Sequence, residues 1–225
     1  SSIRSSLRKV RRMTFPSALT DDPRPLVLDT SVLINLHACT FGERILTAIP
    51  NAVVVPDVVA VELDNETGRR NGDHGFLHGL VGQGTISIVA MTDDEYEDFS
   101  TRTSGTASLD DGEAATIAVA VRRRFRAVID ERKGRAQAVM RMGGEAPGWT
   151  LDLLQHPAVL RTLGEADQTE AIYLALREGR MRIPQELGAA IVALIGMDRA
   201  LHCSCLPNYK GLIKGREGFR NDLEG

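Results

Sequence analysis

Four acidic side chains of this sequence stand where carboxylates could meet in a folded protein. Asp29 directly follows the apolar run Leu26–Leu28, and Asp130 ends a second apolar run. Short continuous apolar runs are typical of buried strands of a parallel sheet. The ends of such strands lie side by side at one edge of the sheet, which is where open α/β sheets bind their ligands. We therefore expect Asp29 and Asp130 to lie close together.

The other two acids, Glu62 and Glu113, are expected on helices. Pro56-Asp57 supplies a helix start, and Glu62 follows on the apolar turn Val58–Val61. An unpaired carboxylate buried on such a turn would be costly. Glu62 is therefore a candidate member of the same cluster.

Glu113 belongs to a helix that we expect to begin at Ser108, where the sequence Ser-Leu-Asp-Asp resembles a capping box. Asp110 lies on the same helical face as Glu113, whereas Asp111 is turned away from Asp110 by about 100°. Asp110 could equally cap this helix or take part in catalysis within the acidic cluster. Which of these acids would act in a site stays open at this point.

Clustered carboxylates repel one another, and the repulsion pushes one or more of them toward protonation. A divalent cation removes this cost. Oxygen ligands with no His or Cys among them favour Mg²⁺ or Mn²⁺ over zinc. Such a site can activate a water molecule and stabilise charge on a transferring phosphoryl group.

The elements that would position these acids alternate between strands and helices. We expect strands at 26–28, 52–55, 85–90 and 126–130, a last strand at 149–154, and further helices at 166–177 and 185–195. Alternation of this kind is typical of a parallel sheet with crossover helices. The predicted fold class is therefore α/β, with a parallel sheet flanked by helices.

Three segments are expected along the chain: a basic, turn-rich arm at 1–24, a core at 25–142, and a largely helical extension at 143–225 that packs on the core. Apolar residues make up 43% of the chain and charged residues 25%, which is ordinary for a globular protein. Because the formal net charge is −3, a nucleic-acid partner would have to meet a local basic patch. No apolar run approaches the ~20 residues of a membrane span. The odd number of cysteines, 3, favours a reducing compartment and hence a cytoplasmic location.

Four stretches of the sequence carry a family resemblance. VLDTSVLIN, VVAVELDNE, LDDGEAATIAVA and AVIDERKGR resemble, in this order, the four acidic motifs of PIN-domain ribonucleases, and the last two are similar especially to a bacterial branch. The resemblance covers roughly residues 25–142, with weaker similarity to about residue 195. It implies a three-layer α/β/α fold and a Mg²⁺- or Mn²⁺-dependent endoribonuclease.

The resemblance also implies roles for individual residues. Asp29, Glu113 and Asp130 would bind the metal, and Glu62 would hold water or orient a ligand. Ser31 resembles a hydroxyl residue that hydrogen-bonds within the acid cluster. The position of Asp110 just before Glu113 leaves open which of the two ligates the metal. Many PIN proteins resemble toxins of toxin–antitoxin pairs, so an antitoxin partner and a homodimer are expected besides the RNA substrate, although this chain is longer than the compact toxins.

Basic residues flank the strand that ends at Asp130. Arg132, Lys133 and Arg135 follow it, and Arg122–Arg124 and Arg126 precede or begin it. They are candidate contacts for RNA phosphates, because phosphate contacts dominate affinity for nucleic acids. The alternative, a solvated helix face, is equally compatible with the pattern.

Two other functions remain to be weighed against a ribonuclease. A catalytically inactive PIN-like module would bind RNA or a protein, but loss of the acids would then be expected and all four are present. A phosphatase of the haloacid-dehalogenase type would use the Asp after the first strand as a nucleophile. That family has a second Asp two residues later, where this chain has Ser31.

Overall fold

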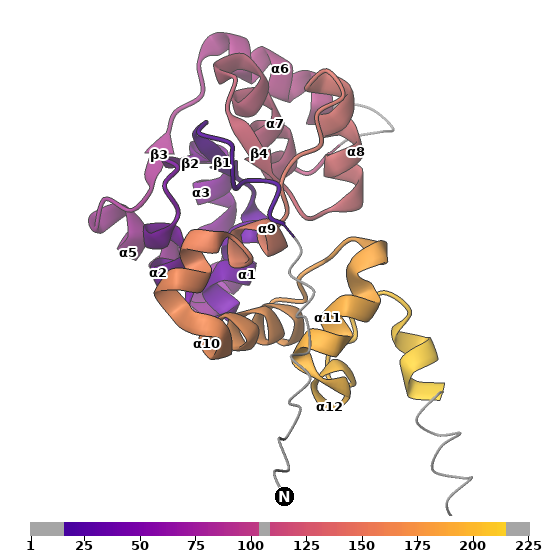
Figure 1. The fold of residues 1–225 in the computed structure, drawn as a ribbon. Helices are drawn as coiled ribbons and strands as arrows, with labels where there is room; N and C mark the ends of the chain where they lie inside the picture. Colours follow the sequence, from indigo (N-terminus) through magenta and orange to yellow (C-terminus); the bar gives the residue numbers. More distant parts are fainter. Residues whose placement is uncertain (1–15, 104–108, 215–225) are drawn as a thin grey trace, which may run out of the picture.

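The fold is built on one parallel sheet, as the alternating pattern predicted. The computed structural model describes residues 16–103 and 109–214. Its four strands are β1 (Leu26–Leu28), β2 (Val53–Pro56), β3 (Ser87–Val89) and β4 (Arg126–Val128), in the spatial order β3-β2-β1-β4. Every pairing between neighbours is parallel (Figure 1). The predicted α/β class is confirmed.

Successive side chains of the strands enter two separate apolar clusters. In β1, Leu26 and Leu28 belong to one cluster and Val27 to the other. β4 repeats this arrangement, with Val128 in the first cluster and Ala127 in the second. Because side chains alternate across a strand, both faces of the sheet are covered, and the molecule has three layers.

The helices divide between the two faces. The first cluster is formed with side chains of α1 (Thr30–Ala38), α2 (Gly42–Ala48), α3 (Asp57–Leu63), α5 (Asp73–Gly82), α9 (Thr150–Leu154) and α10 (Pro157–Arg177). The second is formed with α6 (Asp93–Thr103), α7 (Asp111–Arg123) and α8 (Arg132–Arg141). The short helix α4 (Glu66–Asn71) lies between α3 and α5 in the chain.

Two expected boundaries differ in the structure. Helix α7 begins at Asp111, with Asp110 as its N-cap, whereas the expected start at Ser108 lies outside the described residues. The last expected strand, at 149–154, is wrong. The carboxylate of Asp152 accepts a hydrogen bond from the Trp149 amide (2.8 Å) and so starts helix α9 in its place, and only Gly148 forms a bridge to Val128 of β4.

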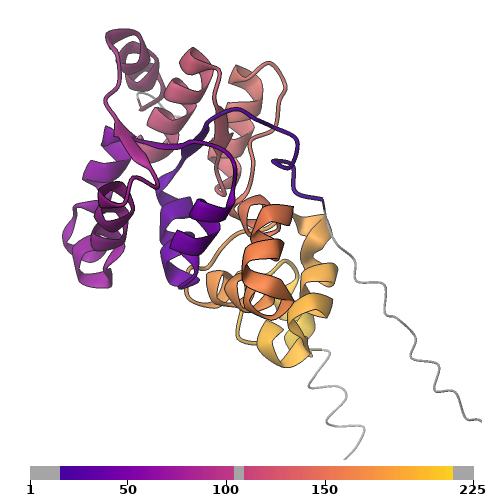
Figure 2. The same cartoon turned by 60° about the vertical axis from the view of Figure 1, so that its left-hand side comes forward.

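The residues after α8 continue as helices around the same core. Helix α10 bends at Gly164, whose φ of 78° is outside the helical region, and it is followed by η1 (Gln185–Leu187), α11 (Gly188–Ile195) and α12 (Met197–Ala200). Leu153, Ile172 and Ile191 are among the side chains of this part that join the first apolar cluster. Figure 2 shows these helices, in orange and yellow, lying together on one side of the molecule. None of the described helices is long and apolar enough to cross a membrane.

Candidate active site

The strand order brings Asp29 and Asp130 together. From β1 the chain adds β2 and β3 on one side and then returns to place β4 on the other side of β1. Open α/β sheets bind ligands at the carboxyl ends of the strands where the order reverses in this way. Asp29 follows β1 directly, and its backbone N–H donates to the carbonyl oxygen of Val128 in β4 (3.3 Å). Both carboxylates therefore lie at the reversal point.

Asp29 is buried and also caps a helix. Its side chain is 2% exposed and accepts hydrogen bonds from the hydroxyl (2.6 Å) and the backbone N–H (3.3 Å) of Ser31. An N-cap carboxylate is held in place by the first turn of its helix. Asp29 is thus fixed at the N-terminus of α1, with Ser31 as its hydrogen-bond partner.

Asp130 is held by two residues that the sequence analysis did not single out. Thr150 donates to it from both its backbone N–H (2.8 Å) and its hydroxyl (2.6 Å), and Asn35 donates from Nδ2 (2.7 Å). Asn35 could have been found as a polar residue on the apolar face of α1, because a buried amide needs a partner. Thr150 was hidden by the wrong expectation of a strand at 149–154.

Glycines let α7 and α8 approach the acids closely. A Cβ atom at Gly112, in α7, would lie 2.5 Å from a carboxylate oxygen of Glu62 and 3.2 Å from one of Asp29. A Cβ atom at Gly134, in α8, would lie 2.5 Å from Oε1 of Glu113. Real Cβ atoms do not approach other heavy atoms within 3.0 Å, so an alanine at either position would force a glutamate carboxylate to shift. Glutamates 62 and 113 are therefore brought to the same edge of the sheet as Asp29.

The carboxylates of Glu113 and Glu62 differ in their hydrogen bonding. Glu113 is 3% exposed, and its Oε1 atom is buried with no hydrogen-bond partner among the described residues. Glu62 is half-buried and accepts a hydrogen bond from the hydroxyl of Thr30. Asp110 accepts from the Glu113 backbone N–H (2.8 Å) as the cap of α7. Its own carboxylate is exposed beside the cluster.

The electrostatics of the cluster favour protonation. Burial, together with the nearby charge of Asp110, raises the pKa of Asp29 to about 7 and that of Glu113 to about 8. Burial also raises the pKa of Asp130 to about 6, against the hydrogen bonds from Thr150 and Asn35. The pKa of Glu62 is raised by burial and by Asp110. These carboxylates therefore act as one mutually repelling cluster, in which positive charge would be stabilised.

A comparison with family models identifies the fold. The family model DUF3368, described as a PIN domain, matches residues 25–197. The chain is a PIN-domain protein. No curated protein and no solved structure matches it significantly. PIN domains are usually nucleases that act on RNA and use divalent metals, so a nuclease-type function follows in general terms.

The acids of this PIN domain suit a hard cation by their chemistry. Carboxylate oxygens are the ligands that Mg²⁺ and Mn²⁺ prefer, and the unpartnered Oε1 of Glu113 is an unused acceptor. In the described ranges, no group of three or more His, Cys, Asp or Glu side chains already has the arrangement of a metal site. The carboxylates would therefore have to turn toward an ion as it binds.

The structure gives Arg135 of the PIN domain a different role from phosphate contact. Its guanidinium donates to the carbonyl oxygens of Ile129 (2.6 Å), Gly148 (2.7 Å) and Pro147 (2.8 Å). It also lies 3.5 Å from the centroid of the Trp149 ring. Because these partners occupy its donors, Arg135 joins the end of β4 to α9 instead of facing solvent. Arg132 and Lys133 are exposed in the first turn of α8.

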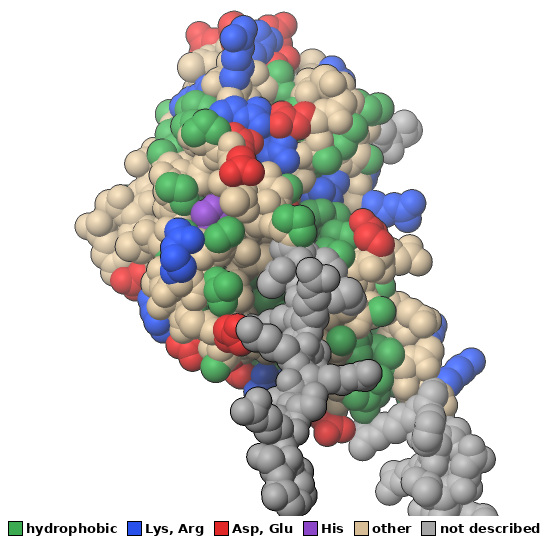
Figure 3. Space-filling model, viewed as in Figure 1, with side chains coloured by type: hydrophobic (Ala, Val, Ile, Leu, Met, Phe, Trp, Pro, Cys, Tyr) green, Lys and Arg blue, Asp and Glu red, His purple; other side chains and the backbone are tan. Residues whose placement is uncertain are grey.

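The basic residues before β4 also differ from the expectation. Ion pairs join Arg122 to Asp98 (2.6 Å), Arg123 to Glu95 (2.7 Å) and Arg126 to Glu145 (2.6 Å). The first two arginines lie in the last turn of α7, at the opposite end from Glu113. Figure 3 shows basic and acidic side chains side by side at the top of the molecule, in the region of α6. These arginines are therefore part of a paired surface away from the acids.

Proposed function

We propose that this PIN domain is an endoribonuclease that hydrolyses RNA phosphodiester bonds with Mg²⁺ or Mn²⁺. The observation that supports the proposal is the meeting of Asp29, Glu62, Glu113 and Asp130 at the point where the strand order reverses. Carboxylates come to this point from two strand ends and two helices, and three of them are almost fully buried. A protein that only bound RNA would have no use for such a costly buried cluster.

Asp29, Glu113 and Asp130 would hold the ion, with Asp110 as a further candidate ligand. When bound, the ion supplies positive charge for the phosphoryl oxygens as negative charge develops on them. Thr150 and Asn35 keep the Asp130 carboxylate in one orientation through their hydrogen bonds. Ser31 does the same for Asp29.

Glu62 is suited to handle the attacking water. It is the least buried of the four acids, with its carboxylate oriented by the Thr30 hydroxyl. Its raised pKa brings it closer to neutral pH, where a general base works best. Glu62 would therefore orient the water and accept its proton. The reaction needs no covalent intermediate with the protein.

The test is the variant Asp29→Asn. The asparagine keeps the shape and can still accept from Ser31, but it removes one ligand charge, so we expect Mn²⁺-dependent cleavage of single-stranded RNA to fall at least about 100-fold. Cleavage is measured on a labelled oligonucleotide, and thermal unfolding checks the fold. Asp167→Asn, which changes an exposed acid of α10, is the matched control and should cleave normally.

Full cleavage by Asp29→Asn would contradict the assignment of the site. Binding of RNA by the wild-type chain without any cleavage would favour the inactive binding module instead. The antitoxin and the homodimer remain predictions from the family resemblance and are not needed for this proposal.

A further inference from the structure

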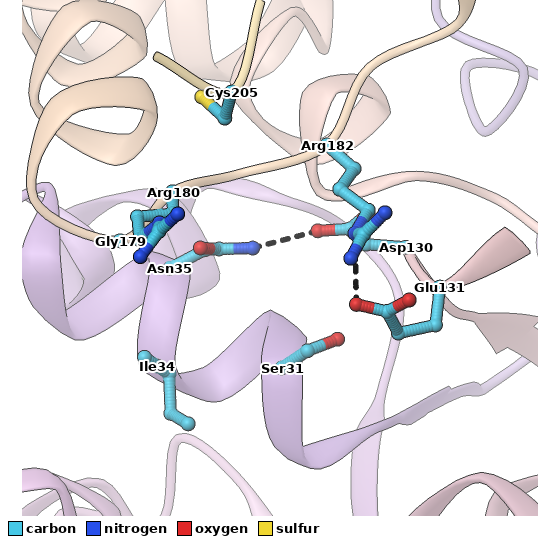
Figure 4. A pocket seen from close by; sticks show the side chains of 9 residues that line it. All are labelled: Ser31, Ile34, Asn35, Asp130, Glu131, Gly179, Arg180, Arg182 and Cys205. Atoms are coloured by element: carbon cyan, nitrogen blue, oxygen red, sulfur yellow. Dashed lines mark hydrogen bonds and ion pairs between the residues drawn. The ribbon is translucent and has the colours of Figure 1, made fainter. Parts of the chain in front are cut away.

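A cavity of about 470 Å³ lies beside Asp130. One wall is acidic and comes from the N-terminal part of the PIN domain. Asp130 and Glu131, after β4, and Asn35, from α1, contribute to it. A second wall comes from the turn after α10 and carries Arg180 and Arg182 (Figure 4). The cavity thus joins the candidate active site to the C-terminal part of the chain.

The turn presents its two arginines because the residues between them are buried. Met181 is 0% exposed and Ile183 is 7% exposed, whereas Arg180 and Arg182 are exposed. The Met181 backbone N–H donates to the carbonyl oxygen of Ala175 in α10 (2.9 Å). The side chains therefore alternate between the core and the cavity, and the core contacts fix the positions from which both arginines extend.

The same turn packs directly on a residue of the candidate active site. A Cβ atom at Gly179 would lie 2.5 Å from Oδ1 of Asn35, and the Nδ2 atom of Asn35 donates to Asp130. One amide side chain therefore contacts both the basic turn and a candidate metal ligand. The basic wall and Asp130 are held at a fixed separation through Asn35.

The charges of the two walls are complementary but only partly paired. Arg182 Nε lies 2.8 Å from Oε1 of Glu131, and these side chains are 59% and 39% exposed. Arg180 has no ion-pair partner among the described residues. An exposed pair of this kind is weak, so a stronger anion can replace Glu131 on Arg182. Guanidinium groups suit phosphate oxygens because of their planar array of donors.

An acidic cluster alone would repel RNA, since each nucleotide carries a negative phosphate. We propose that Arg180 and Arg182 form a subsite for a backbone phosphate of the RNA that flanks the phosphodiester to be cleaved. This inference rests on the proposed ribonuclease function. It gives the turn after α10 a direct part in substrate binding, so the candidate active site is completed by the C-terminal part of the chain.

The test compares RNA binding with and without the two arginines. Full-length chains with Asp29→Asn, which is expected to slow cleavage strongly, are titrated with a fluorescent single-stranded RNA oligonucleotide in Mn²⁺ at several salt concentrations. Adding Arg180→Ala and Arg182→Ala should weaken binding at least about tenfold at low salt. It should also flatten the slope of log affinity against log salt by about 0.7, since the subsite takes one phosphate and each phosphate contact on a single strand contributes about 0.7.

Two further variants isolate the subsite. Arg44→Ala with Arg199→Ala removes the same charge from exposed arginines that pair with acids of α10 and do not line the cavity. This control should change affinity much less. Arg180→Lys with Arg182→Lys restores the charge without the planar donors and should recover part of the affinity. In the chain that keeps Asp29 and can cleave RNA, the same two lysine substitutions should raise KM more than they lower kcat.

The outcomes separate this inference from the proposed function. If the double alanine variant binds RNA with the parent affinity and salt slope while the wild-type chain cleaves RNA, the subsite is wrong and the nuclease stands. If the control pair weakens binding as much as the cavity pair does, general charge explains the effect and the subsite is also wrong. If the wild-type chain neither binds nor cleaves RNA, both proposals fail.

Discussion

At the scale of single residues, the candidate site depends on two positions that carry no side chain. Gly112 and Gly134 contribute nothing to chemistry, yet a Cβ atom at either would overlap a carboxylate oxygen. The close approach of α7 and α8 to the acids is therefore encoded by glycine. A substitution there acts on the positions of Glu62 and Glu113 and leaves their chemical groups intact.

Gly112→Ala should consequently impair cleavage while every acid is still present. The added methyl group must displace Glu62 or Thr30, and a displacement of about 1 Å costs about 100-fold in rate. RNA cleavage by the purified variant measures the loss. Gly79→Ala is the matched control, because a Cβ atom at Gly79, in α5, has nothing within 4 Å. The control should keep full activity and gain about 0.5–1 kcal/mol of stability. Equal activity of the two variants would show that the close packing of Gly112 against Glu62 is not needed for cleavage.

Some residues of the site were predictable and others were not. Asp29 and Asp130 follow apolar runs, so their convergence was expected from the geometry of parallel strands. Asn35 and Thr150, which hold Asp130, were not expected, because their importance depends on which side chain faces them across the fold. The polar Asn35 on an apolar helix face does indicate a buried partner, but the sequence of one chain does not say that this partner is Asp130.

At the scale of elements, Arg135 joins α8 to the end of β4 and to the segment just before α9. It extends from α8 and donates to carbonyl oxygens at the end of β4 and in the segment just before α9. Burial lowers the pKa of this guanidinium to about 10, so it stays charged at neutral pH. Its hydrogen bonds and its contact with Trp149 position the segment that leads to Thr150.

Arg135→Ala should therefore reduce stability, in contrast to the effect of a lost RNA contact. Carbonyl oxygens lose charge-assisted hydrogen bonds and the Trp149 ring loses its cation, so we expect the free energy of unfolding to fall by about 2–4 kcal/mol. Urea unfolding measures it. Arg132→Ala, on the exposed side of the same helix, should stay within about 0.5 kcal/mol of the wild type. A stable Arg135→Ala variant with weaker RNA binding would return Arg135 to the role of phosphate contact.

The elements themselves were largely predictable from periodicity, with one informative failure. The strands β1, β3 and β4 fall within the expected runs, and β2 extends one residue beyond its expected run, to Pro56. The run at 149–154 forms α9, because Asp152 caps the helix start. The prediction failed because periodicity cannot distinguish a strand from a helix over a run as short as this one. The expected pairing with the sheet survives only as the single bridge of Gly148.

At the scale of the whole molecule, the buried carboxylates link stability to pH and to metal. The pKa values of Asp29, Glu113 and Asp130 are raised to about 7, 8 and 6, from ordinary values of 3.8, 4.5 and 3.8. Between the ordinary and the raised values, the folded protein keeps protons that the unfolded chain has released. Their contribution to stability is therefore complete below pH ~4 and is lost as the pH rises through about 6–8.

The metal-free protein should accordingly unfold at a lower temperature at pH 8.5 than at pH 5.5, with a difference of up to a few kcal/mol in stability. Calorimetry in EDTA measures this trend. Mg²⁺ should restore stability mainly at the higher pH, because it binds the ionised carboxylates of the folded state. Asp29→Asn should reduce the pH dependence. A melting temperature in EDTA that does not change over this pH range would contradict the coupling of the acids.

The extent of the domain was the least predictable feature at this scale. A boundary was expected at 142, but side chains from both sides of it share one apolar cluster, and the family match continues to residue 197. Helices such as α10 have apolar faces that fit many partners, so their sequence does not say what they cover. The division at 24 and 142 stays a prediction.

The strand order also has a consequence for the synthesis of the protein. Asn35 and Asp130, which meet in the fold, are 95 residues apart. A ribosome adds roughly 5–20 residues per second, so roughly 5 to 20 s pass between the translation of the two. During this interval the growing chain lies beside ribosomal and messenger RNA with its acidic cluster incomplete. For the proposed ribonuclease, placing the last carboxylate after a late strand would delay cleavage until most of the domain has left the ribosome.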